Sequence, residues 1–160
     1  MRAVKRALPL LLLAATACSG GSSSGGLAKA RTDYIVRAEA VCTKTLADKK
    51  ALTTPSSVKE LSPYVDAIVR LADQATTDLL KIEPPAQDKA DLDKHVFTPL
   101  HDQLVTARAY ADEVRAAAKR NDTTALAKLL TNPPTKTAAD LTWMRKYGFH
   151  DCAEVADTSG

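Results

Sequence analysis

Apolar side chains recur at three- and four-residue spacing along most of this chain, and that spacing limits the possible folds more than any other feature. The first such stripe consists of Ile35, Ala38, Cys42 and Leu46, which would lie on one face of a helix. No segment alternates apolar and polar residues over six positions, as a half-buried strand would. The pattern therefore predicts an all-α fold.

Prolines and short polar turns divide the helical pattern into four segments. We expect helices over residues 32–51, 57–82 and 86–120, and a fourth segment in two pieces, 123–131 and 136–147. Ser57 and Glu60 form a capping-box pattern at the start of the second helix. Short connections make consecutive helices antiparallel. The sequence thus predicts an up-down-up-down four-helix bundle with kinked or broken helices.

Two prolines fall inside the predicted helices. Pro63 lies in the first two turns of the second helix, which either restarts with Ser62 as its cap or bends there. Pro99 lies in the middle of the third helix, where its ring would clash with the carbonyl group of His95, so we expect a kink. Gly148 suits a left-handed cap that ends the fourth segment.

The first seventeen residues have the composition of a secretory signal peptide. Residues 1–6 are positively charged, and residues 7–17 are small or apolar. This stretch of eleven residues is shorter than the ~20 that span a membrane, so an uncleaved anchor is disfavoured. Residues 15–18 resemble the lipobox of bacterial lipoproteins, in which the cysteine receives a diacylglycerol and becomes the mature N-terminus. The alternative is a secreted protein cut near Ala17, in which Cys18 has no role.

The N-terminal pattern divides the chain into three parts. Residues 1–17 are the expected lipoprotein signal peptide, 18–31 are the lipidated Cys18 with a flexible tether, and 32–157 are the helical bundle domain. Residues 19–26 consist only of Gly and Ser, which is typical of a flexible linker. We therefore expect a domain held by lipid chains on the outer face of the cell membrane.

The remaining cysteines bear on both compartment and topology. If Cys18 carries lipid, Cys42 and Cys152 are left, and an even remainder in an exported protein favours one disulfide. Two unpaired buried thiols are the alternative. In an up-down-up-down bundle the end of the fourth segment lies near the start of the first, so residues 148–152 would bring Cys152 to Cys42. Two distant cysteines do not form a structural zinc site.

Charge and composition exclude several classes of function. The chain has 22 Lys and Arg against 19 Asp and Glu, and Arg2, Lys5 and Arg6 account for the whole excess. Nucleic-acid binding needs a clustered basic surplus, so we expect no nucleic-acid partner. Gly148 is the single glycine between residues 27 and 159, which excludes a glycine-rich phosphate loop.

Few residues form a pattern that carries chemistry. Asp91 and His95 are four positions apart and could hold a metal on one helix face, but a solvated acidic turn is the simpler interpretation. His101 and His150 have no partner in any known motif. Trp143 and Tyr147 are one helical turn apart, and this end forms either a hydrophobic plug or a small ligand site. We therefore expect no catalytic residue, no metal site and no cofactor.

Three stretches of the chain stand out together: residues 34–42, which run from a tyrosine to a cysteine, the segment 80–85 ending in Pro-Pro, and the final GFHDC at 148–152. With the lipobox, they resemble the small alanine-rich lipoproteins of actinobacteria, a group without an assigned function. The resemblance implies an exported helical bundle with a cysteine pair. It implies no catalytic residues.

These observations lead to one expected function and two alternatives. We expect a membrane-anchored extracytoplasmic lipoprotein that acts as a non-enzymatic binding or interaction module of the cell envelope. Its partners would be the membrane, through the lipid anchor on Cys18, and an unknown envelope protein or ligand. The alternatives are a carrier of a small hydrophobic ligand or metal within the bundle, and an envelope enzyme with an unrecognised site.

Overall fold

The computed structural model describes residues 23–134 and 139–157, and every regular element within them is helical. These elements are α1 (Ser23–Lys50), α2 (Val58–Leu80), α3 (Lys89–Leu92), the π-helical segment η1 (Asp93–Phe97), α4 (Thr98–Lys119), α5 (Thr123–Thr131), α6 (Leu141–Tyr147) and α7 (Asp151–Ala156). The all-α prediction is confirmed. The expected signal peptide and the lipidated Cys18 lie outside the described residues.

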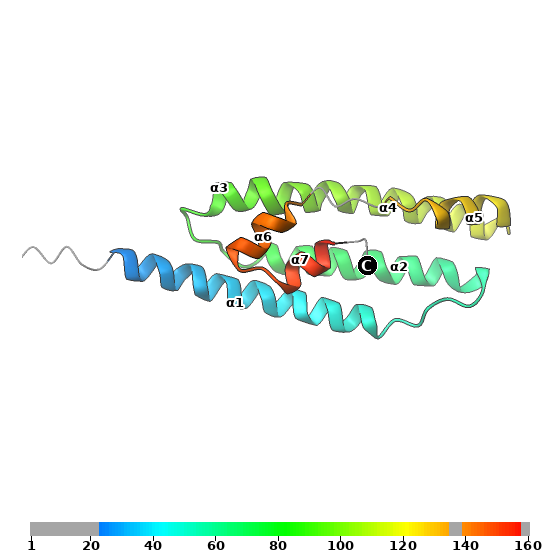
Figure 1. Ribbon diagram of the computed structural model, residues 1–160. Helices are drawn as coiled ribbons and strands as arrows, with labels where there is room; N and C mark the ends of the chain where they lie inside the picture. Colours follow the sequence, from blue (N-terminus) through cyan, green and yellow to red (C-terminus); the bar gives the residue numbers. More distant parts are fainter. Residues whose placement is uncertain (1–22, 135–138, 158–160) are drawn as a thin grey trace, which may run out of the picture.

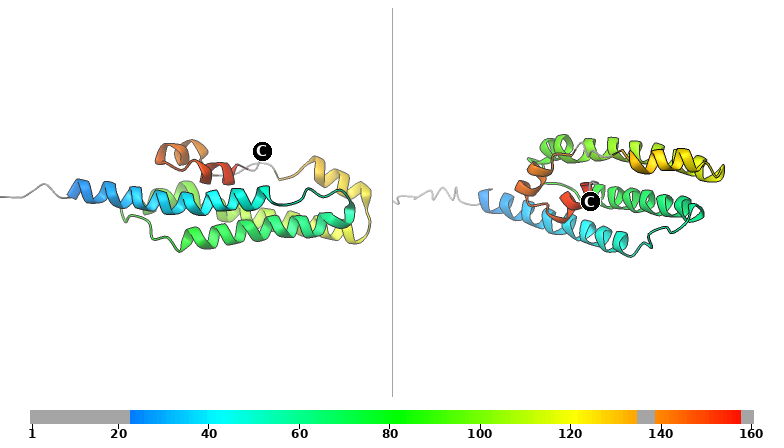
Figure 2. Two further views of the ribbon diagram at one scale, coloured as in Figure 1. Left: turned by 90° about the horizontal axis from the view of Figure 1, so that it is seen from below. Right: turned by 45° about the vertical axis from the view of Figure 1, so that its right-hand side comes forward.

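The body of the molecule consists of α1, α2 and the continuous run of α3, η1 and α4, which lie as long helical rods (Figure 1). α2 packs against α1 on one side and against α4 on the other. After α4 the chain forms three short helices instead of one long helix. α5 folds back along the end of α4, whereas α6 and α7 lie between α1 and the η1 segment (Figures 1 and 2). The up-down-up-down order of four helices is therefore not confirmed.

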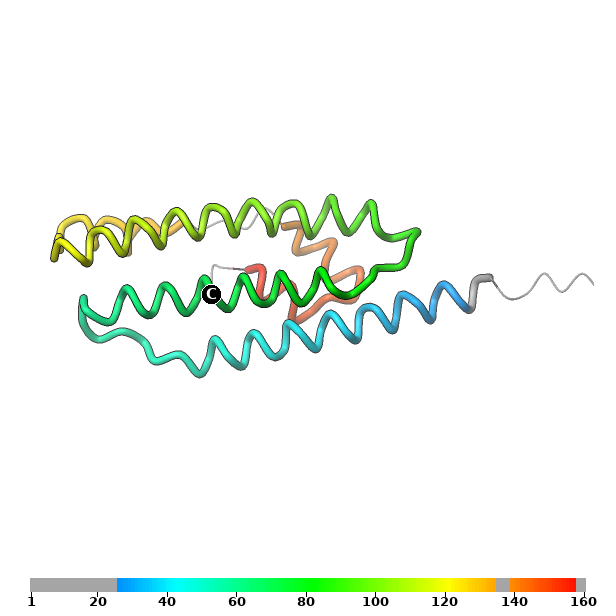
Figure 3. The backbone as a smooth tube through the Cα atoms, turned by 180° about the vertical axis from the view of Figure 1, so that it is seen from behind, coloured from blue at the N-terminus to red at the C-terminus, as the bar shows by residue number. Residues whose placement is uncertain are grey.

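The first helix begins earlier than its sequence pattern indicates. α1 starts at Ser23, whereas we placed residues 23–31 in the flexible tether. Its first turns project beyond the other helices, as the tube in Figure 3 shows, and residues 26–33 are exposed. Once later turns are fixed by packing, adding residues such as Ala28 and Ala30 to the same helix costs little, because propagation is easier than nucleation.

The chain accommodates Pro99 through one wide helical turn. Proline has no N–H group to donate to the turn before it. The backbone N–H of Thr98 bonds to the carbonyl oxygen of Asp93, five residues back, so η1 is π-helical immediately before Pro99. The expected kink thus takes the form of a local widening between α3 and α4. At Pro63, α2 continues without the restart that we considered at Ser62.

A disulfide joins the first helix to the last one. Cys42 on α1 and Cys152 on α7 are bonded, with their Cα atoms 4.9 Å apart, so the predicted disulfide is confirmed. Gly148 ends α6 with a left-handed φ of 116°, as its position indicates. The helix that follows, α7, is not evident from the sequence. Its first backbone N–H groups, on His150, Asp151 and Cys152, donate to the carboxylate of Glu39 at 2.9–3.0 Å.

Most buried apolar side chains belong to two separate clusters, and Ala75, Leu104 and Ala111 are buried outside both. The larger one, which we call the disulfide core, includes Tyr34, Cys42, Leu92, Met144 and Phe149. The smaller one, which we call the distal core, consists of Val114, Ala117 and Leu126 with partly buried neighbours on α2, α4 and α5. The two clusters lie at opposite ends of α2 and α4, and the middle of these helices lies between them.

Candidate functional site

A groove opens between the two cores, along the middle of α2 and α4. It has a free volume of about 160 Å³ and takes its walls from α1, α2, α4 and α7. Most of its lining side chains are aliphatic: Ile68, Leu71, Ala72, Ala75, Leu79, Leu100, Leu104, Ala107 and Val155. No aromatic ring and no acidic side chain lines it. We call it the apolar groove.

The polar side chains at this groove differ in how far they are already engaged. The hydroxyls of Thr45 and Thr76 donate to the carbonyl oxygens of Val41 and Ala72 on their own helices, each at 2.9 Å. Gln103 donates to the carbonyl oxygen of Ala156 at 3.4 Å. Lys49 is the one charged side chain in the lining, and it is exposed and forms no ion pair with any described residue. Lys49 is therefore the polar group most available to a ligand.

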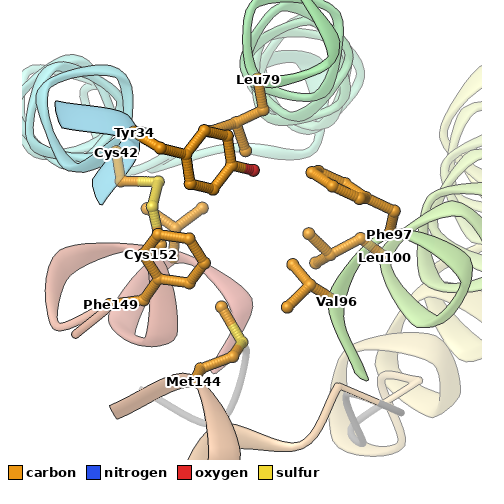
Figure 4. A pocket seen from close by; sticks show the side chains of 10 residues that line it. Tyr34, Cys42, Leu79, Val96, Phe97, Leu100, Met144, Phe149 and Cys152 are labelled. Carbon is orange, nitrogen blue, oxygen red and sulfur yellow. A yellow bond between two sulfur atoms is a disulfide. The ribbon is translucent and has the colours of Figure 1, made fainter. Parts of the chain in front are cut away.

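A small internal cavity adjoins the groove inside the disulfide core (Figure 4). Its volume is about 20 Å³, and Leu79, Leu100 and Val155 line both spaces. The Tyr34 hydroxyl points into it between Leu79 and Phe97. Burial raises the pKa of Tyr34 to about 12, so this phenol stays protonated at any physiological pH.

Sequence analysis does not reveal this groove, although it identifies the stripes that line it. Three of its lining side chains are small: Ala72 and Ala75 on α2, and Ala107 on α4. Alanine lets neighbouring helices approach but fills little volume. The proline pair at 133–134, which breaks the fourth segment, is the sequence signal that could have indicated an incomplete wall.

A second cluster of polar and aromatic groups joins the start of α1 to α6. Asp88 is 4% exposed, and its carboxylate accepts hydrogen bonds from the Arg31 guanidinium and from the Tyr147 hydroxyl, the latter at 2.8 Å. The Arg31 hydrogen bonds hold the pKa of Asp88 below its usual value. Burial, together with the bond to Asp88, raises the pKa of Tyr147. Asp88 is thus a structural anion, whereas its sequence context indicates a solvated turn.

The aromatic residues near α6 pack against one another. Trp143 stacks with His95 at 5.0 Å and with Tyr147 at 4.9 Å between ring centroids. Tyr147 also contacts Phe149, and the Arg31 guanidinium lies 5.3 Å from the centre of the Tyr147 ring. The rings thus pack against each other as a plug would, and Trp143 and Tyr147 also line an open hollow of about 230 Å³, as a small ligand site would.

The histidines do not come together. His95 faces α6, where its Nδ1 lies 3.3 Å from a carboxylate oxygen of Asp140, while the side chains of His101 and His150 are exposed. Within the described residues, no three His, Cys, Asp or Glu side chains are grouped as metal ligands. None of the described helices is long and apolar enough to cross a membrane.

No family of proteins, no curated protein and no solved structure matches this chain.

Proposed function

We propose that this chain is a membrane-anchored extracytoplasmic lipoprotein whose helical body is a non-enzymatic binding module of the cell envelope. The observation that carries the binding role is the apolar groove, an open and mainly aliphatic hollow lined from four helices. The lipobox at residues 15–18 supports the anchor, and the Cys42–Cys152 disulfide is typical of proteins outside the cytosol.

The arrangement of the short helices fits this role. We propose that α5 and the α6–α7 pair share the fourth position of an up-down-up-down bundle. Among the described residues each of these elements covers one end of α2 and α4, and the groove lies along the middle, where the buried Ala75 and Leu104 line it. This favours the carrier of a small hydrophobic ligand as the second candidate function over an enzyme, since the groove lining holds no nucleophile paired with a base.

The anchor is tested by replacing the lipidated residue. Cys18→Ser should abolish incorporation of an alkyne-labelled fatty acid and move the protein from the detergent phase to the aqueous phase. The matched control is the Cys42→Ser/Cys152→Ser double variant, which removes the other two cysteines and should retain the label. Unchanged detergent partitioning of the Cys18→Ser variant would refute the lipid anchor.

The binding role is tested in cells. Crosslinking of the native lipoprotein, followed by identification of the crosslinked protein and lipid species, should recover the same envelope component in repeated experiments. Variants that fill the groove should lose it. Recovery of no reproducible component, together with turnover of an envelope substrate, would replace the binding module by the enzyme alternative.

A further inference from the structure

The walls of the apolar groove select for shape. They present branched aliphatic and methyl groups from four elements and no aromatic ring. A flat aromatic ligand would therefore find no stacking partner, whereas a flexible alkyl chain gains from contact with aliphatic surface alone. An apolar cavity of ~150 Å³ is large enough to hold benzene, so the groove, at about 160 Å³, accepts part of a single chain.

The inner end of the groove adjoins the small cavity in the disulfide core. Leu79, Leu100 and Val155 separate the groove from the small cavity beside the disulfide and line both. The polar atoms of the lining are few in both, so a hydrocarbon tail is the part of a ligand that belongs there.

The charge at the rim selects the other end of the ligand. Lys49 lines the groove, while the nearby acid Asp48 is engaged by Lys44. An anionic head group beside Lys49 would gain a charge-assisted hydrogen bond, and a cationic head group would be repelled. A peptide segment fits less well, because its backbone N–H and C=O groups would face aliphatic walls and threonine hydroxyls that already donate within their own helices.

From these features we infer that the apolar groove binds one unbranched alkyl chain ending in an anionic oxygen group, a carboxylate or a phosphate, with the head beside Lys49 and the tail toward Leu79, Leu100 and Val155. The inference rests on the proposed binding function and names its ligand class. Lys49 is 26 positions after Ser23, which places the head group about 39 Å along α1 from the end that follows the anchor.

Photolabelling tests this ligand class on the complete lipoprotein, reconstituted through its own anchor into phosphatidylcholine nanodiscs. The probes are palmitic acid with a mid-chain diazirine and the alcohol with the same chain and diazirine. After irradiation, peptide mass spectrometry should place the label on residues 68–79 of α2 and 100–107 of α4. Label spread over the surface, or concentrated on the exposed start of α1, would overturn the inference and indicate contact with the bilayer alone.

Two variants with matched controls separate the roles of volume and charge. Ala107→Phe fills the groove and should lower labelling by both probes about tenfold, whereas Ala109→Phe, on an exposed position of the same helix, should not. Lys49→Glu should lower labelling by the acid about fivefold and spare the alcohol, and Lys50→Glu should leave both unchanged. If the acid labels the Lys49→Glu variant as strongly as it labels the parent protein, the inference of an anionic head group is wrong.

The result remains informative if one variant is unstable. Circular dichroism identifies a misfolded Ala107→Phe chain. In that case labelling of the Lys49→Glu variant, whose substitution is at an exposed position, still tests the inference. Failure of the inference is also distinct from failure of the proposed function. If neither probe labels the groove but cellular crosslinking still recovers a protein partner, the ligand class is wrong and the binding module stands. If crosslinking recovers no protein while both probes label the groove as described, the ligand class is supported and the proposal of an envelope protein partner is refuted.

Discussion

The two buried cores of this protein are built in different ways. The disulfide core combines a crosslink, stacked aromatic rings and the buried carboxylate of Asp88. The distal core has three fully buried side chains, Val114, Ala117 and Leu126, and no disulfide among its described residues. In a chain of alanine-rich helices, which bury little area per residue, a disulfide and buried polar contacts can reinforce one end of the fold. The groove lies where that reinforcement stops.

Removing the disulfide should have the largest effect on this difference. The crosslink spans 110 positions, and the chain-entropy model assigns a loop of that size a stabilisation of about 4.7 kcal/mol. The Cys42→Ala/Cys152→Ala variant should therefore lose roughly 4–5 kcal/mol of unfolding free energy, measured by urea denaturation. Its stability should not respond to reductant, unlike that of the parent. A loss below about 1 kcal/mol would mean that the disulfide core does not depend on its crosslink.

A matched pair of leucines compares the packing of the two cores. Leu92 is 0% exposed in the disulfide core, and Leu126 is 3% exposed in the distal core. Leu92→Ala should cost about 4 kcal/mol and Leu126→Ala about 2 kcal/mol, because the short α5 can move to close the space left at Leu126. Urea denaturation of both variants measures the two values. Equal losses, or the reverse order, would contradict the claim that the distal core is the more adaptable one.

Asp88 links the stability of the disulfide core to pH. Hydrogen bonds from Arg31 lower its pKa below the ordinary value of 3.8, so its contribution is present above that value and is lost as the pH falls through the folded-state pKa. Asp88→Asn should cost about 1.5 kcal/mol at neutral pH, a modest figure because Arg31 is half exposed. The measurement is unfolding free energy between about pH 5 and about pH 2, where the variant should show a flatter profile. Asp91→Asn, at an exposed position, serves as the control and should match the parent.

Two aspartate caps provide the smallest expected effects. Asp122 accepts from the N–H of Ala125 at the start of α5, and Asp140 accepts from the N–H of Trp143 at the start of α6, both at 2.9 Å. Each Asp→Ala change should cost about 1 kcal/mol. Hydrogen exchange should show faster opening of α5 in the Asp122 variant, with little change in α6 for the Asp140 variant because the disulfide core holds it in place. Equal acceleration in both helices would argue against that difference.

Local sequence features predict the elements of this fold better than their contacts. The spacing of apolar residues defines the long helices, Gly148 defines the end of α6, and the cysteine count leads to the disulfide. The partnership of Arg31 with Asp88 is not predictable in this way, because it joins positions 57 residues apart whose own neighbourhoods indicate solvent. α1 begins at Ser23, within the stretch of Ser and Gly residues, because later turns of the same helix are held by packing. The composition of that stretch alone predicts a flexible linker.

The candidate site is less predictable for a related reason. Periodicity shows which residues face inward, but it does not show whether another element covers them. Ala75 and Leu104 have the pattern of ordinary core positions, and they are buried, yet they also line the groove. The role of Lys49 likewise follows from its place at the rim and not from any motif. A groove forms where packed helices leave a gap between them, and the spacing of apolar residues along the sequence does not show where such gaps occur.

Glu39 on α1 holds the start of α7 by hydrogen bonds that do not involve the disulfide. Its carboxylate gathers the N–H groups of His150, Asp151 and Cys152, one turn before Cys42 on the same helix. These bonds join the same two helices as the disulfide does, so α7 is held to α1 in two independent ways. After reduction of the S–S bond, they would keep the two thiols close together, which favours re-formation of the same pair.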